Sequence, residues 1–286
     1  TDANVTVAGG DLIIDSNFGA GGNVDISSAA ALDLGAIELD AGDTATIQTT
    51  GAMTTGADIS ATGTLNLSAN GITVSNLIEA KAMTLNSSDD YTDSDDIGNA
   101  ALVVNAGTAA VLTASGGNLT LQALSIGDGA DPVSNADVVV AGGQLNIDAD
   151  GGTGNVLVES GTALILGTVV SEAGDSTSIF ANATTLTTNV ADDITTLGTL
   201  SLLGDGIIIA NNVTAKVLTI SSSATVADEA DQALVVNNTK VLQTTAGAMT
   251  LKAVSILDDV GAGGDVSVLV AGANNLVIDG DAGAAA

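Results

Sequence analysis

The sequence repeats itself, and this repetition constrains the fold more than any other feature. NVTVAGGDLIID at 4–15 returns as DVVVAGGQLNID at 137–148 and as VSVLVAGANNLVID at 266–279. GNVDISSAAALDLG at 22–35 likewise returns as GNVLVESGTALILG at 154–167, so that Gly22 corresponds to Gly154. An internal duplication of about 132 residues predicts a repeat architecture, in which each unit buries its apolar edge against the next unit.

The phase of the repeat divides the chain. We expect a first unit at residues 1–133, a second at 134–265 and the start of a third at 266–286. Because each unit would stack on its neighbour, the three parts are expected to form one continuous rod.

Short strands dominate the local pattern. Apolar residues alternate with Thr, Asn, Asp and Ser over a few positions, and turns rich in Gly, Asn and Asp separate these runs. Many of the apolar pairs recur at a regular interval along the chain. This spacing predicts an all-β fold, a parallel β-solenoid (β-helix) with coils of about 20 residues. The residues expected to line its interior are Leu65, Leu67, Leu119, Leu121, Leu145 and Ile147, and, in the second copy, Leu200, Leu202, Met249, Leu251, Leu276 and Ile278.

A pair of tandem β-sandwich domains is the alternative fold. A sandwich core normally contains large aromatic side chains. This chain has no Trp, one Tyr and two Phe. A thin interior lined with Val, Ile, Leu and Ala does not need aromatic residues, and the composition therefore favours the solenoid.

The charge balance excludes several partners. The chain has 34 acidic residues, four lysines and no arginine, and its formal net charge is −30. Binding to nucleic acid or to an anionic membrane surface requires clustered cations, so both are excluded as partners. We expect no membrane insertion either, because no apolar run has spanning length. A strongly acidic surface suits a saline or calcium-containing medium, and we expect an extracellular or cell-surface location.

Residues that could carry catalysis are scarce. The chain contains no His and no Cys, which removes the commonest general base and the thiol nucleophile. We therefore expect no catalytic residues and no enzyme activity. Carboxylate pairs remain, and glycosidases use such pairs. A β-helix protein that binds or degrades polysaccharide is accordingly the alternative function.

One acidic motif resembles half of a calcium loop. The pattern D-x-[D/N]-x-G places alternating carboxylate or amide oxygens before a glycine that permits a sharp turn. Ordinary Asx turns at the ends of strands explain the same pattern. Calcium is the only cofactor that the sequence suggests, and its candidate ligands are Asp15, Asn17, Asp148, Asp150, Asp279 and Asp281. A second acidic segment, SSDDYTDSDD at 87–96, is expected to be an insertion loop.

Two segments resemble a known group of proteins. TGTLNLSANGITVSNLIEAKAMTLNSS at 62–88 and GGNLTLQALSIG at 116–127 are similar to the haemagglutinin-type repeats of filamentous-haemagglutinin-like bacterial surface exoproteins, which include giant β-strand-repeat adhesins. The resemblance implies a right-handed parallel β-helix, secretion to the cell surface and a role in adhesion or fibre formation. The duplicated unit of this chain is longer than the short repeat of that family.

These observations together predict a structural, non-enzymatic protein, either a subunit of a surface fibre or a stalk segment of an adhesin. Its expected partners are further copies of itself stacked end to end, or neighbouring repeats of a longer chain, and a host or matrix surface. Such stacking is expected because an uncapped sheet edge offers unpaired backbone groups.

Overall fold

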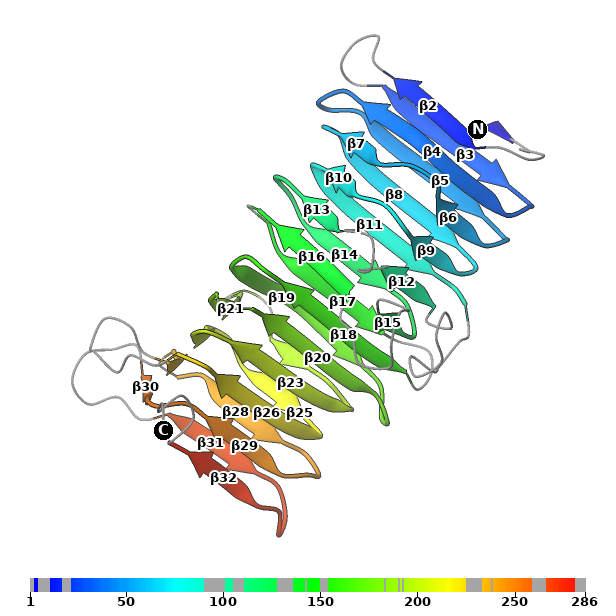
Figure 1. The fold of residues 1–286 in the computed structure, drawn as a ribbon. Helices are drawn as coiled ribbons and strands as arrows, with labels where there is room; N and C mark the ends of the chain where they lie inside the picture. The colour runs from blue at the N-terminus through cyan, green and yellow to red at the C-terminus, as the bar shows by residue number, and fades with distance from the viewer. Residues whose placement is uncertain are drawn as a thin grey trace. The chain divides into compact units, whose positions relative to one another are not determined.

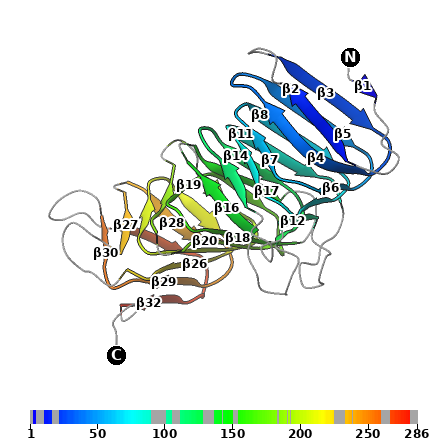
Figure 2. The same ribbon diagram turned by 45° about the horizontal axis from the view of Figure 1, so that its top comes forward.

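The computed structural model is a parallel β-solenoid, as predicted (Figures 1 and 2). It contains 32 strands and no helix within the residues that it describes, which are 3–4, 11–16, 22–89, 101–104, 111–127, 136–141, 143–149, 154–182, 184–189, 191, 193–224, 233–237, 239–258 and 266–280. The strand pairs of the fold, such as Leu65 with Met83 and Leu200 with Leu218, are parallel. β-Sandwich domains are antiparallel, and the alternative fold is therefore wrong.

The chain divides into two compact units, Thr1–Val158 and Glu159–Ala286. Each unit winds in coils, and each coil contributes short strands to three stacks. A strand such as β8 buries Leu65, Leu67 and Ala69 and turns Thr64, Asn66 and Ser68 outward, so period-2 alternation defines the inside and the outside of the coil.

In unit 1 the three stacks are as follows. The first face is β1 (Ala3–Asn4), β3 (Asn23–Ser28), β5 (Thr44–Thr49), β8 (Thr64–Ala69), β11 (Ala82–Ser87), β14 (Leu119–Gln122) and β17 (Leu145–Ala149). The second is β4 (Leu32–Leu39), β6 (Met53–Thr55), β9 (Ile72–Val74), β12 (Leu102–Val104) and β15 (Ile126–Gly127). The third is the end of β4, which turns a corner, with β7 (Ile59–Ala61), β10 (Ile78–Ala80), β13 (Leu112–Ala114) and β16 (Ala136–Val140). β2 (Leu12–Ser16) pairs along β4.

Unit 2 also has three stacks, and each takes the number of the stack in unit 1 that holds the equivalent residues of the repeat, not of the sheet that it continues. The first face is β20 (Ser176–Ala181), β23 (Thr199–Gly204), β26 (Val217–Ser222), β29 (Met249–Lys252) and β32 (Leu276–Asp279). The second is β19 (Leu164–Ser171), β21 (Leu186–Thr188), β24 (Ile207–Ile209), β27 (Leu234–Val236) and β30 (Ile256–Asp258). The third is β22 (Ile194–Thr195), β25 (Val213–Ala215), β28 (Val241–Thr244) and β31 (Ser267–Val270). The strand β18 (Asn155–Ser160) spans the boundary between the units.

The internal duplication is visible in the coil lengths, which the strand register gives. On the first face of unit 1, the coil from Thr64 to its partner Ala82 is short, whereas the coils from Met83 to Leu119 and from Leu119 to Leu145 are long. In unit 2, the coil from Thr199 to Val217 is short, whereas those from Leu218 to Met249 and from Met249 to Leu276 are long. The two units therefore repeat the same order of short and long coils, and the coil length predicted from the sequence describes only the short ones.

The interior is aliphatic, and most of the predicted core residues lie in it. The six predicted in the first copy are buried, and so are Leu200, Leu202, Met249 and Leu251. The expected burial is wrong for Leu276 and Ile278, which are 44% and 62% exposed although their register directs them inward. Both side chains lie on β32, whose only partner among the described strands is β29. An inward side chain is covered fully only when coils lie on both sides of it.

Candidate functional site

The most distinctive surface of unit 2 is its last described coil. β31 pairs with β28 and β32 pairs with β29, and neither has a partner on its other edge among the described strands. Leu269 on β31 is 53% exposed, and Val277 on β32 is 44% exposed, like its neighbours Leu276 and Ile278. We call β31 and β32, with these four side chains, the terminal coil.

The equivalent residues of β17 are buried. Leu145 and Ile147 on β17 occupy the positions of Leu276 and Ile278 in the repeat, and both are fully buried. In β32 the inward direction is unchanged, because Leu276 is in register with the buried Met249 and Ile278 with the buried Leu251. Within the described residues, β32 therefore combines exposed core side chains with a strand edge that has no partner, and a further coil could pair with that edge.

The predicted calcium ligands are only partly described. Asn17, Asp150 and Asp281 lie outside the described residues, so the complete D-x-[D/N]-x-G turns cannot be built. Asp15 faces outward on β2, in register with Glu38. Asp148 accepts a hydrogen bond from Gln122 Nε2 at 3.3 Å, and Asp279 is in register with Lys252. Calcium binding stays a prediction.

The acidic insertion at 87–96 is also mostly outside the described residues. Its described part is Ser87, Ser88 and Asp89. Ser87 belongs to β11, and its buried hydroxyl donates a hydrogen bond to the backbone oxygen of Ala101. The segment lies in the chain between Met83 and Leu119, which are in register on β11 and β14, and its loop structure stays a prediction.

Each unit has a buried carboxylate at a corner of its coil, in the turn directly before β5 or β20, and the sequence did not predict it. Asp43 is 1% exposed, and its carboxylate accepts hydrogen bonds from the backbone N–H groups of Gly22, at 2.6 Å, and Asp40, at 3.3 Å. Asp175 is equally buried and accepts a hydrogen bond from the N–H of Glu172 at 2.6 Å. The available signal was the repeated D/E-A-G-D turn at 40–43 and 172–175. Hydrogen bonds from backbone N–H groups offset the burial of these charges, so the role is structural.

The next coil packs closely on this corner. A Cβ atom at Gly63 would lie 2.4 Å from the backbone oxygen of Asp43, and one at Gly198 would lie 2.5 Å from that of Asp175. Lys81 and Lys216 follow in the stack, and their N–H groups donate to the backbone oxygens of Gly63 and Gly198. Lys81 and Lys216 therefore occupy equivalent places in the backbone of the two copies.

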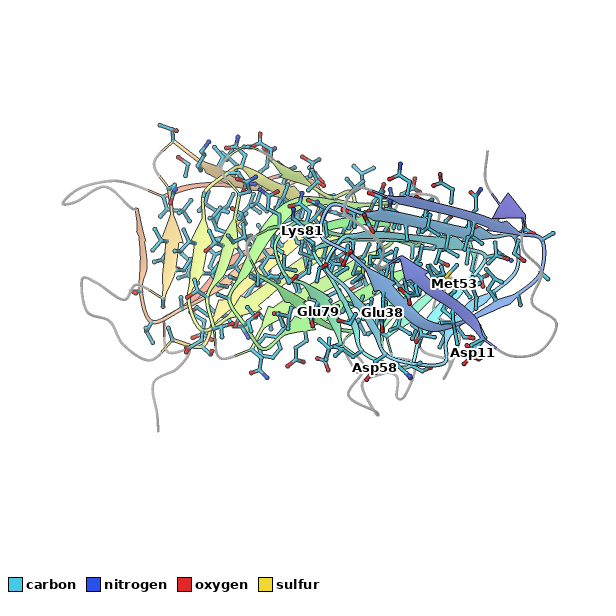
Figure 3. The ribbon with its side chains drawn as sticks, turned by 90° about the horizontal axis from the view of Figure 1, so that it is seen from above. Asp11, Glu38, Met53, Asp58, Glu79 and Lys81 are labelled. Carbon is cyan, nitrogen blue, oxygen red and sulfur yellow. The ribbon has the colours of Figure 1, made fainter. Side chains whose placement is uncertain are left out.

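Acidic side chains of unit 1 gather away from its first face. Glu38 and Glu79 flank Ser60 in register on the third face, and Figure 3 shows them on the same side of the unit as Asp58. Asp33 is exposed on the second face and accepts a hydrogen bond from the Thr54 hydroxyl at 3.0 Å. These carboxylates are exposed, and they give the second and third faces their negative charge.

Among the described carboxylates of unit 2, Asp193 has a shifted pKa. Hydrogen bonds from the side chain and the backbone N–H of Asn212, both at 3.0 Å, hold the pKa of Asp193 below its ordinary value. Nearby Lys240 lowers it further, while desolvation acts in the opposite direction. Asn212 Oδ1 in turn accepts a hydrogen bond from the N–H of Val241, so the pair connects successive coils.

The chemistry available on these surfaces is limited. Within the described residues, no group of three or more His, Cys, Asp or Glu side chains is arranged to hold a metal ion. The same part of the chain contains no helix that is long and apolar enough to cross a membrane. Comparison with protein-family models, with curated proteins and with solved structures found no match. The resemblance to filamentous-haemagglutinin-like exoproteins therefore stays a prediction.

Proposed function

We propose that this protein is a structural, non-enzymatic component of an extracellular fibre or adhesin stalk, assembled by end-to-end stacking of solenoid coils. The terminal coil is the observation that carries the proposal. It exposes Leu276 and Ile278, whose equivalents Leu145 and Ile147 are fully buried. Another coil laid on β32 would cover these side chains and pair its free backbone groups.

The chemistry of the partner follows from the repeat. The coil that fits β31 and β32 is a further solenoid coil, supplied by a second copy or by a neighbouring repeat of a longer chain. A contact of this heterologous kind does not close on itself and therefore generates filaments. The net charge of −30 opposes it, and added salt or calcium should favour it by screening.

An extracellular location is part of the proposal. The acidic composition and the exposed carboxylates of unit 1, such as Glu38 and Glu79, suit a medium rich in cations. A fibre or stalk requires a long stack of coils and no catalytic centre. Aliphatic ladders and parallel backbone pairing between coils would stabilise such a stack.

Light scattering of two matched variants tests the proposal. Ile278→Asp places a charge on the terminal coil, whereas Ile165→Asp places the same charge at a 44% exposed position on β19. Scattering by the wild type and by Ile165→Asp should rise with protein concentration and with salt, and Ile278→Asp should remain monomeric. Growth of Ile278→Asp equal to that of the wild type would overturn end-to-end stacking through β32.

A further inference from the structure

The first face of unit 1 carries no charge over its four central strands. Alternation in β5, β8, β11 and β14 turns eleven side chains outward, and all of them are polar and uncharged except for one alanine. We call this set the neutral face. It consists of Thr44, Thr46, Gln48, Thr64, Asn66, Ser68, Ala82, Thr84, Asn86, Thr120 and Gln122.

The neutral face lacks the carboxylates that mark the third face of unit 1. The outward positions of the other two faces include the exposed carboxylates of Asp33, Glu38 and Glu79. On the first face, Asp25 and Asp148 appear only on β3 and β17, which flank the four central strands. Two copies that approach through the third face of unit 1 would bring the carboxylates of Glu38 and Glu79 against each other, whereas the neutral face lets them approach with less repulsion.

The side chains of the neutral face are arranged in regular rows. Thr46, Asn66 and Thr84 are in register on adjacent strands, as are Gln48, Ser68 and Asn86. Rows of Asn, Gln and Thr at the strand spacing can interdigitate and hydrogen-bond with an identical face, as they do where flat sheets stack in ordered assemblies.

We propose that the neutral face is the lateral contact between copies of this chain, and that fibres bundle through it. The inference rests on the proposed end-to-end assembly. Four strands of about six residues cover roughly 15 by 20 Å, an area of about 300 Å². This area is well below the roughly 800 Å² that each partner of a stable pair buries. A single contact is therefore weak, and the contact becomes strong when it repeats along two stacked fibres.

A neutral polysaccharide is the competing partner for such a surface. Sugar-binding surfaces generally use aromatic platforms, and none of the eleven outward side chains is aromatic. A second copy would present rows of the same spacing as the rows of the neutral face. The observations therefore favour a second copy over a polysaccharide.

Two pairs of isosteric substitutions test the proposal. Asn66→Asp with Asn86→Asp adds two charges to the neutral face, and Asn70→Asp with Asn76→Asp adds the same two charges at the turns before β9 and β10. Negatively stained wild-type fibres should bundle as salt rises. The Asn66/Asn86 variant should give single fibres of undiminished length, and the Asn70/Asn76 variant should bundle like the wild type.

Other outcomes overturn the inference in distinguishable ways. Bundling of the Asn66/Asn86 variant at wild-type levels would remove the neutral face as the lateral contact and leave end-to-end assembly intact. Absence of fibres from the wild type would overturn both proposals. Wild-type fibres that stay single at every salt concentration, but bind a neutral polysaccharide through Asn66 and Asn86, would assign this face to sugar.

Crosslinking gives an independent readout, because the chain has no cysteine. Thr84→Cys lies on the neutral face, and Thr73→Cys lies on the second face. A short bis-maleimide should join Thr84→Cys chains into covalent dimers within bundles and leave Thr73→Cys chains unjoined. Equal dimer yields from the two variants would contradict a lateral contact through the neutral face.

Discussion

Leu145 and Leu276 occupy the same position in the repeat, yet Leu145 is fully buried and Leu276 is 44% exposed. Each is in register with a buried residue of the preceding coil, Leu119 in the first case and Met249 in the second. The coil therefore directs both side chains inward, and their different exposure depends on what covers them from the other side.

Truncation of these two leucines should have unequal effects on stability. Leu145→Ala removes fully buried methyl groups and leaves a cavity, which should lower the free energy of unfolding by about 2–5 kcal/mol. Leu276→Ala removes partly exposed atoms and should lower it by less than about 1 kcal/mol in the monomer. Urea denaturation of both variants at low salt measures the contrast, and equal losses would contradict the burial difference.

The corner glycines should be intolerant of a methyl group. Gly63→Ala would bring Cβ to 2.4 Å from the Asp43 backbone oxygen, and the shift needed to relieve this contact should destabilise unit 1 by about 1–3 kcal/mol. Gly161→Ala is the matched control, because nothing lies within 4 Å of its added Cβ. Thermal unfolding should show a lower Tm for Gly63→Ala alone, and an unchanged Tm there would mean that the corner can relax.

The buried carboxylate of Asp43 should matter more than its exposed neighbours. Asp43→Asn replaces one acceptor oxygen by an amide donor facing the N–H groups of Gly22 and Asp40, which should destabilise the fold by about 1–3 kcal/mol. Asp58→Asn changes a carboxylate on the acidic side of the same unit and should be nearly neutral. Chemical denaturation compares the two, and similar unfolding free energies would argue against a structural role for Asp43.

How far the sequence predicts this structure can be judged from particular residues. The alternation around Leu65 and Leu67 is local, and it correctly predicted strands, faces and interior. The exposure of Leu276 and Ile278 depends on what covers their coil, so a local pattern could not reveal it. Asp43 and Asp175 were missed because a carboxylate normally marks an outward position, and here backbone N–H groups surround it. The neutral face required the register of four strands, which alternation alone does not give.

Acid should weaken the link between Asp193 and Asn212. Because the folded-state pKa of Asp193 lies below its ordinary value of 3.8, ionised Asp193 contributes stability above that value. The contribution is lost as the pH falls from 3.8 through the folded-state pKa. Asn212→Ala removes the largest cause of the shift and should raise the pKa of Asp193 toward 3.8. Carboxyl NMR titration of both proteins checks this, and an unchanged titration in the variant would exclude Asn212 as the cause.

Calcium should stabilise the protein if the D-x-[D/N]-x-G turns bind it. Millimolar calcium would then raise the Tm by linkage, and magnesium would do so less well because it prefers fewer, more rigidly placed ligands. Asp148→Ala with Asp150→Ala should remove part of the increase. A melting curve that does not respond to calcium would leave these residues as turn formers.

Electron microscopy of the negatively stained wild-type protein, across a series of salt and calcium concentrations, tests end-to-end coil stacking most directly. The exposed terminal coil predicts unbranched fibres that lengthen as the charge of −30 per chain is screened. Isolated single particles under every condition, at high protein concentration, would contradict the proposed assembly.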